Sequence, residues 1–190
     1  MYRPLLRDAR FSALLMEMDR DRLEQVRSAG CPKCGGPLHT AHFERKPGGV
    51  LVAPEQLPEG YAVRFDLCCG SCRRRTLPAS VRFLGRKVFL AVAIVVATAL
   101  VRGGDRNAVE LLRRQLGASR STLARWGRWW RELRRTAMWI QARGTLPVDL
   151  DDLALPASLL ERYAGSAADR MVRLLRWLSP LSGRVPEQVG

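Results

Sequence analysis

Apolar residues recur at helical spacing over residues 1–29. The apolar positions of this segment, which charged residues separate, are Phe11, Leu14, Leu15, Met18, Leu23 and Val26. Because residues three or four positions apart share one face of a helix, the spacing predicts an amphipathic helix. Gly30 is a typical residue to end it.

Helical periodicity is lost between residues 30 and 83, where glycine, proline and short β-prone runs replace it. VLVA (50–53) and YAVRFDL (61–67) are predicted as strands. The turn-rich PEQLPEG (54–60) connects them.

A helical pattern returns at residue 84 and includes the apolar run 88–101. A membrane-associated protein that uses this run is one interpretation. As a helix the run rises about 21 Å, less than the roughly 30 Å of a hydrocarbon layer. We therefore expect a buried core helix and no membrane insertion.

Residues 105–137 carry the signals of two helices joined by a tight turn. Asp105 is suited to cap a first helix that runs to about Leu116. Gly117 is suited to the left-handed turn, and Ser119 to cap the second helix. The apolar side of the second helix comprises Leu123, Trp126, Trp130, Leu133 and Ala137. The opposite side carries Ser121, Arg125, Arg128, Glu132 and Arg135, with Arg120, Ala124 and Arg131 at its edge.

This arrangement predicts a helix-turn-helix unit. Packed on the first helix and on the run 88–101, the apolar side completes a tri-helical unit. The arginine side is then free for a DNA major groove, with Arg120, Ser121, Thr122, Arg125 and Arg128 as the candidate contacts. A helical hairpin with a solvated arginine face is the alternative.

Two C-x-x-C motifs form the main chemical signal. Cys31 and Cys34 make the first knuckle, and Cys69 and Cys72 make the second. Four thiolates on two glycine-backed knuckles complete a closed tetrahedral site, so we expect a structural zinc ion rather than a redox pair. Cys68 competes with Cys69 as ligand, but the two-residue spacing favours Cys69 and leaves Cys68 as a packing residue. His39 and His42 follow the first knuckle and are expected to face solvent.

The patterns together predict an α-rich α+β fold with four segments. These are an N-terminal helical segment (1–29), a small β zinc ribbon (30–83), the helix-turn-helix unit (84–142), and short C-terminal helices with a tail (143–190). PASLLERYAG (156–165) and SAADRMVRLLRWL (166–178) are the short helices.

Charge points to a polyanionic partner. The 190-residue chain holds 32 Lys and Arg against 18 Asp and Glu, a formal net charge of +14. Only Lys33, Lys46 and Lys87 are lysines, so arginine carries most of the positive charge. Guanidinium donors match phosphate oxygens and guanine edges, which favours nucleic acid over an anionic membrane surface. An alanine- and arginine-rich composition inherited from a GC-rich genome is the alternative explanation.

Arg73, Arg74 and Arg75 follow the second knuckle directly. A metal-pinned hairpin would hold them rigid, and we expect them to contact phosphates only. Residues 1–30 carry charges throughout and show no secretion signal, so a cytoplasmic location, where thiols stay reduced, is expected.

The knuckle pair, RKPGG (45–49), CRRRTLPASVRFLGRKV (72–88) and LGASRSTLARW (116–126) together resemble a family of bacterial mobile-element proteins. These are small transposase-like proteins with a zinc ribbon and a helix-turn-helix, and the resemblance covers residues 28 to 180. It implies zinc at the four knuckle cysteines and DNA contact near residues 120–128. Complete transposases of this kind continue into an RNase H-like domain with an acidic triad, for which this chain has no length. Asp149, Asp151 and Asp152 are expected to be capping or solvated residues and not a two-metal site.

The resulting hypothesis is a non-enzymatic, zinc-stabilised DNA-binding protein associated with, or derived from, a transposition system. RNA in place of DNA, a separate transposase and a homo-oligomer are further candidate partners. A zinc-ribbon module that binds a partner protein and is recruited to nucleic acid by its charge is the alternative function.

Overall fold

The computed structural model describes residues 2–46, 48–84, 89–102, 104, 106–142 and 154–182. Four features of the sequence lie outside these ranges: the start of the apolar run at Val88, the Asp105 cap, the aspartates at 149–152 and the tail from residue 183.

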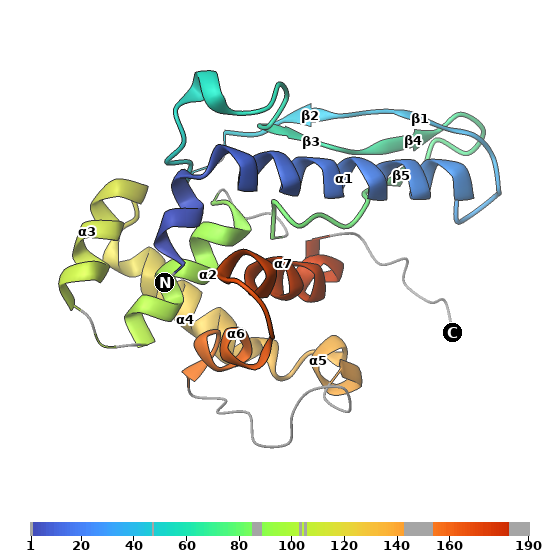
Figure 1. Ribbon diagram of the computed structural model, residues 1–190. Coiled ribbons are helices and arrows are strands. Elements are labelled where there is room, and N and C mark those ends of the chain that lie inside the picture. Colours follow the sequence, from blue (N-terminus) through green and yellow to red (C-terminus); the bar gives the residue numbers. More distant parts are fainter. Residues whose placement is uncertain are drawn as a thin grey trace.

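Helices make up most of the described chain, and a small β-structure occupies one end of it (Figure 1). The α-helices are α1 (Ala9–Ala29), α2 (Ala91–Arg102), α3 (Arg106–Leu116), α4 (Arg120–Leu133), α5 (Ala137–Ala142), α6 (Ala157–Arg162) and α7 (Ala167–Leu178). The 3-10 helices are η1 (Arg3–Arg7), η2 (Pro54–Gln56) and η5 (Ser179–Ser182). The predicted α-rich α+β class is therefore confirmed.

Helix α1 is the predicted N-terminal helix, and both of its ends have a clear physical cause. Asp8 caps it, because its carboxylate accepts from the backbone N–H groups of Arg10 and Phe11 at 2.8 and 3.2 Å. Gly30 ends it with a φ of +76°, which a side chain would strain. Leu14 is 46% exposed, so this residue does not belong to the buried side on which the periodicity placed it.

The β-structure consists of two antiparallel sheets. In the first, the strand order is β1 (Leu38–Thr40), β4 (Leu67–Cys69) and β5 (Arg75–Thr76). The second pairs β2 (Phe43–Glu44) with β3 (Val63–Arg64). A backbone hydrogen bond from Ala41 to Asp66 (2.9 Å) joins the two sheets into one long β-ribbon, and one from Arg45 to Ala62 (3.0 Å) extends it beyond β2 and β3.

The strand predictions were correct only in part. Residues 50–53 are irregular, because the segment 38–44 pairs with the 63–69 strands in their place. Val52 is nevertheless buried, so its apolar character reflects core packing. The predicted strand 61–67 is replaced by β3 and β4, with an interruption at residues 65–66.

A buried ion pair connects α1 to the segment that follows the β-ribbon. Arg82 Nε lies 2.8 Å from Asp19 Oδ2, and the two side chains are 0% and 1% exposed. The Asp19 carboxylate also accepts from the Ser80 hydroxyl (2.6 Å) and from the Val81 N–H (2.7 Å). Each terminal guanidinium nitrogen of Arg82 donates to a backbone carbonyl, Nη1 to that of residue 61 and Nη2 to that of residue 63. Every charged atom of the pair therefore has a partner, which is the condition for tolerating such a pair in a core.

The chain's C-terminal part joins the same network. Arg64 is buried and donates to the carbonyls of Pro78 and Ser182. Burial lowers the pKa of Arg64 to about 10. The Ser182 hydroxyl accepts from the backbone N–H of Ser80 and donates to the carbonyl of the same residue. As a result, the β-ribbon, α1 and η5 are joined by buried polar contacts as well as by one continuous apolar core.

Helix α2 forms the centre of the helical half, and the predicted core helix is confirmed. Its residues from Ala91 to Thr98 are buried, and it contacts α3, α4, α7 and η1. None of the described helices combines the length and the apolar character needed to cross a membrane. The two predicted C-terminal helices are present as α6 and α7, and Ser166 and Asp169 cap α7 reciprocally.

Loss of one partner of the Asp19–Arg82 pair should destabilise the fold far more than loss of one partner of a surface ion pair. Asp19→Asn leaves the Arg82 charge buried without a counter-charge, so we expect the free energy of unfolding to fall by about 3–5 kcal/mol. Denaturant titration measures it. Glu17→Gln is the matched control on the same helix, because Glu17 pairs with Arg20 at the surface and should cost about 0–1 kcal/mol. Equal losses for the two variants would contradict the proposed role of the buried pair.

Candidate functional site

The four knuckle cysteines come from two turns at the same end of the β-ribbon. Cys31 and Cys34 lie in the turn that follows α1, whereas Cys69 ends β4 and Cys72 precedes β5. The two turns approach closely at Gly36, where an added Cβ would lie 2.6 Å from the Ser71 hydroxyl. A side chain at position 36 would therefore crowd Ser71 and the Cys69 sulfur, which lies 3.3 Å from the added Cβ.

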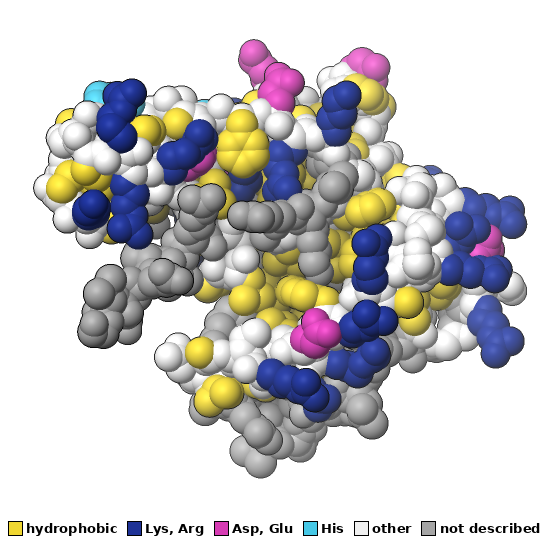
Figure 2. Space-filling model, turned by 180° about the vertical axis from the view of Figure 1, so that it is seen from behind, with side chains coloured by type: hydrophobic (Ala, Val, Ile, Leu, Met, Phe, Trp, Pro, Cys, Tyr) yellow, Lys and Arg dark blue, Asp and Glu magenta, His cyan; other side chains and the backbone are white. Residues whose placement is uncertain are grey.

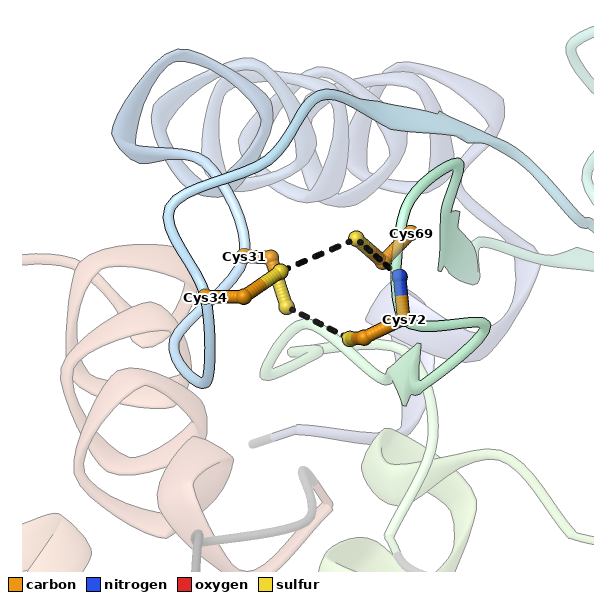
Figure 3. Close-up of side chains that lie close together, drawn as sticks. All are labelled: Cys31, Cys34, Cys69 and Cys72. Carbon is orange, nitrogen blue, oxygen red and sulfur yellow. Dashed lines mark hydrogen bonds between the residues drawn. The ribbon is translucent and has the colours of Figure 1, made fainter.

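The thiols converge on one point between the turns (Figure 3). The sulfurs of Cys31 and Cys72 are 3.5 Å apart, as are those of Cys34 and Cys69. All four lie within 4.8 Å of one another. A disulfide needs about 2.05 Å, so these are free thiols. Four sulfurs about 2.3 Å from a tetrahedral ion are about 3.8 Å apart, so the cluster fits a metal such as zinc.

The electrostatics of the cluster favour a cation. The backbone N–H of Cys72, 3.4 Å from the Cys69 sulfur, and that of Ser71 outweigh burial and lower the pKa of Cys69 to about 6. The pKa of Cys31 is also lowered, mainly by the N–H of Lys33. For Cys34 the N–H of Gly36 acts in the same direction, but the thiols of Cys69 and Cys72 outweigh it and raise the pKa to about 11. A positive ion bound among the sulfurs would offset the effect that raises the pKa of Cys34 and would favour its thiolate.

Cys68 lies outside the cluster, as its spacing predicted. Its sulfur lies 3.6 Å from the carbonyl oxygen of Arg73 and 3.8 Å from that of Cys69. His39 is exposed, in agreement with the prediction. His42 is not: it is half-buried, its Nδ1 lies 3.1 Å from the Asp66 nitrogen, and its ring packs 5.0 Å from that of Phe65. The prediction for His42 was wrong because residues 65–66, between β3 and β4, partly cover it.

The three arginines that follow the second knuckle separate into two groups. Arg73 and Arg74 are exposed, and neither guanidinium contacts an acidic residue in the part of the chain that the structure describes. Arg75 instead forms a 2.6 Å ion pair with the buried carboxylate of Asp66 and donates to the carbonyl of Ala41 at 2.8 Å. Arg75 thus balances a buried charge and fastens β5 to its neighbours. Its predicted phosphate contact would compete with this pair.

The turn between α3 and α4 has the predicted local structure. Gly117 adopts a φ of +64°, and the Ser119 hydroxyl accepts from the Thr122 N–H at 3.1 Å. The buried side of α4 consists of Leu123, Trp126, Trp130 and Leu133. Helix α4 ends at Leu133, so Ala137 does not extend this side but begins α5, where it is exposed.

The predicted opposite side of α4 is exposed throughout. It comprises Arg120, Ser121, Ala124, Arg125, Arg128, Arg131 and Glu132, and Arg135 follows the helix. Thr122, which the sequence placed among the DNA contacts, is 8% exposed. Its hydroxyl accepts from Arg125 at 3.1 Å and lies 2.9 Å from the Ser119 hydroxyl. Thr122 therefore orients Arg125 and is itself covered.

An acidic clamp on α3 was missed by the sequence reasoning. Glu110 pairs with Arg113 at 2.7 Å and with Arg114 at 3.1 Å. Arg113 also donates to the carbonyl of Ala118 at 3.3 Å, which ties the clamp to the turn. These two arginines, Arg113 ahead of Arg114, lower the pKa of Glu110 to about 2. The spacings of three and four residues were the available signal.

Basic side chains gather on the face of the molecule seen in Figure 2. They extend over the half formed by α3 and α4 and recur at the knuckle end of the β-ribbon. Comparison with family models, with curated proteins and with solved structures finds no match, so the arrangement of the residues carries the functional argument.

Substitution of single cysteines separates ligands from neighbours. Cys34→Ser should abolish metal binding and loosen the β-ribbon, because three sulfurs leave the tetrahedron open. Cys68→Ser is the matched control, with metal content and stability close to those of the unaltered protein. Elemental analysis of purified protein measures the bound metal. Metal retained in Cys34→Ser but lost in Cys68→Ser would refute this ligand set.

The Glu110 clamp predicts a pH dependence. The folded-state pKa is depressed from 4.5 to about 2, so the clamp's stabilisation is present above pH 4.5 and is lost as the pH falls toward 2. Glu110→Gln should therefore be less stable than the unaltered protein at neutral pH, with a difference that shrinks across this window. Denaturant titrations at several pH values measure it. Glu132→Gln is the control for charge, and a difference for Glu110→Gln that is constant with pH would contradict the clamp.

Proposed function

We propose that this chain is a zinc-stabilised protein that binds duplex DNA through the exposed face of α4. The observation that carries the proposal is the division of this helix into two sides. Apolar side chains, including Trp126 and Trp130, hold one side in the core, and arginines occupy the other. Such a helix is rigidly mounted and presents its cations to a partner.

The dimensions of α4 suit the major groove of DNA. A helix with its side chains is about 10–12 Å wide, and the groove is about 12 Å wide. In the proposed complex the first turn of α4 enters the groove, with Arg120, Ser121 and Arg125 near base edges. Arg128 and residues beyond it lie along the phosphates. Thr122 is buried and contributes indirectly, because its hydroxyl accepts a hydrogen bond from Arg125 and orients that side chain.

In this proposal the α3–turn–α4 segment acts as a helix-turn-helix. The Ser119 cap and the left-handed Gly117 support it, because they set the angle at which α4 leaves the turn. The hydrogen bond from Arg113 to the carbonyl of Ala118 stiffens the same turn. Packing of α2 against both helices supplies the third helix of the unit.

Zinc has a structural role in the proposal. Cys31, Cys34, Cys69 and Cys72 would hold it, and a closed site of four sulfurs leaves no position for a substrate. The ion would fix the end of the β-ribbon, where β1, β4 and β5 are only two or three residues long. In this proposal the chain acts by binding and not by catalysis, and it works with, or derives from, a transposition system, as the resemblance to transposase-like proteins implies.

Replacing single arginines on α4 tests the proposal. Arg120→Ala or Arg125→Ala should weaken binding to a preferred duplex by about 1–3 kcal/mol, because contacts to base edges are lost. The loss on random DNA should be much smaller. The preferred duplex is first selected from a random pool, and affinities are then measured by fluorescence anisotropy.

Arg10→Ala, on an exposed part of α1, is the control for a lost charge. Equal weakening on every duplex would reduce α4 to a phosphate-binding surface. Unchanged binding by both α4 variants would refute the proposed interface.

A further inference from the structure

We infer that Arg73 and Arg74 form a second phosphate contact, so that one chain binds duplex DNA at two places about one helical turn apart. The inference rests on the proposed function and extends it from one helix to a bipartite surface. It concerns the size of the DNA site, which the α4 face alone does not define.

Helix α1 sets the distance between the two places. Its 21 residues correspond to about 31 Å of helix. The first knuckle begins directly after its C-terminal end, at Cys31. Arg73 is held at this end, since its backbone N–H donates to the carbonyl of Cys69 at 3.1 Å.

The opposite, N-terminal end of α1 lies on the side of the molecule where α4 begins. An open groove of about 530 Å³ there is lined by Arg3 and Arg7 of η1 and by Leu112 and Gln115 of α3. Because α3 ends at Leu116, the turn that starts α4 lies beside η1. The first turn of α4 thus lies toward one end of α1 and the knuckle arginines at the other, which separates them by about the length of this helix.

The spacing is rigid and both places are accessible from one side. Arg27, near the end of α1, donates to the Thr40 hydroxyl of β1 at 3.1 Å, and the Asp19–Arg82 pair holds the middle of the helix. Figure 2 shows Lys and Arg side chains at the knuckle end and over the α3–α4 half on the same face. In the proposed complex one duplex contacts both places.

Salt screening limits the effect that Arg73 and Arg74 can have on the affinity for a duplex bound at α4. At physiological ionic strength the Debye length is about 8 Å, so cations about 30 Å away barely affect a duplex bound at α4. Arg73 and Arg74 can add affinity only by contacting phosphates of the same duplex. One turn of B-DNA is about 34 Å, or about 10 base pairs, and this is the minimum length that such a contact requires.

Binding to short and long duplexes distinguishes one contact from two. The variant is Arg73→Gln/Arg74→Gln in the full chain. The probes are a G·C-rich duplex of about 8 base pairs, or about 27 Å, and one of about 24 base pairs. On the long duplex, loss of two phosphate contacts should lower the slope of log K against log salt by about 1.8. On the short duplex, where α4 alone is engaged, affinity and slope should match those of the unaltered protein.

Controls keep the outcomes separate. Arg10→Gln/Arg20→Gln removes the same charge from exposed positions on α1 and should leave both slopes unchanged. Metal content and circular dichroism check that the knuckle variant is folded. Equal losses on both lengths, or no loss on either, would overturn the bipartite surface while DNA binding through α4 stands. Absence of binding by the unaltered protein to either duplex would overturn the proposed function itself.

Discussion

The buried pair between Asp19 and Arg82 is the interaction on which the rest of the structure depends. Removal of two charges from water costs several kcal/mol for each ion, and only complete satisfaction of both groups offsets this cost. Here the satisfaction comes from four parts of the chain: α1, the loop at Tyr61, β3 and the segment 80–82. The rings of Tyr61, Phe65 and Phe83 lie about the Arg82 guanidinium at 4.9 to 5.4 Å and exclude water from it. An arrangement that misplaces any one of these parts leaves a charge unpaired.

This constraint makes the β-ribbon and the helices one mechanical unit. The sheets are too small to be stable alone, and they gain a core only by packing on α1 and the 80–84 segment. At one end the cysteine cluster closes the ribbon, and in the helical half α2 packs against α3 and α4. The C-terminal Ser182 then hydrogen-bonds to Ser80, within the network of Asp19 and Arg82. Any function that requires fixed distances across the molecule, such as contact with an extended polymer, benefits from this rigidity.

The arginines of this protein have several different roles, which its net charge does not show. Of the three consecutive arginines after the second knuckle, Arg75 neutralises Asp66. On α3 the single carboxylate of Glu110 pairs with both Arg113 and Arg114, which leaves one net positive charge. Arg64 and Arg82 are buried and stabilise the fold. The exposed face of α4 and the knuckle end are two of the places where cations remain for a partner, and further exposed arginines lie on η1 and α1. The cationic surface available to a partner is therefore smaller than the net charge of +14 suggests.

The sequence by itself determined the features that depend on near neighbours in the chain. Helix periodicity, the Ser119 cap, the glycine turn at 117 and the choice of Cys69 over Cys68 all follow from spacings of a few residues, and the structure bears them out. Tertiary structure alone decided what depends on burial and long-range pairing. Residues 50–53 have strand-like composition but enter the core without pairing, and β1 and β2 take the strand positions. Likewise, the partners of Arg75 and Arg82 lie 9 and 63 residues away in the chain. No local pattern reveals such contacts, because the free energy that selects them arises only when the folded core removes both groups from water.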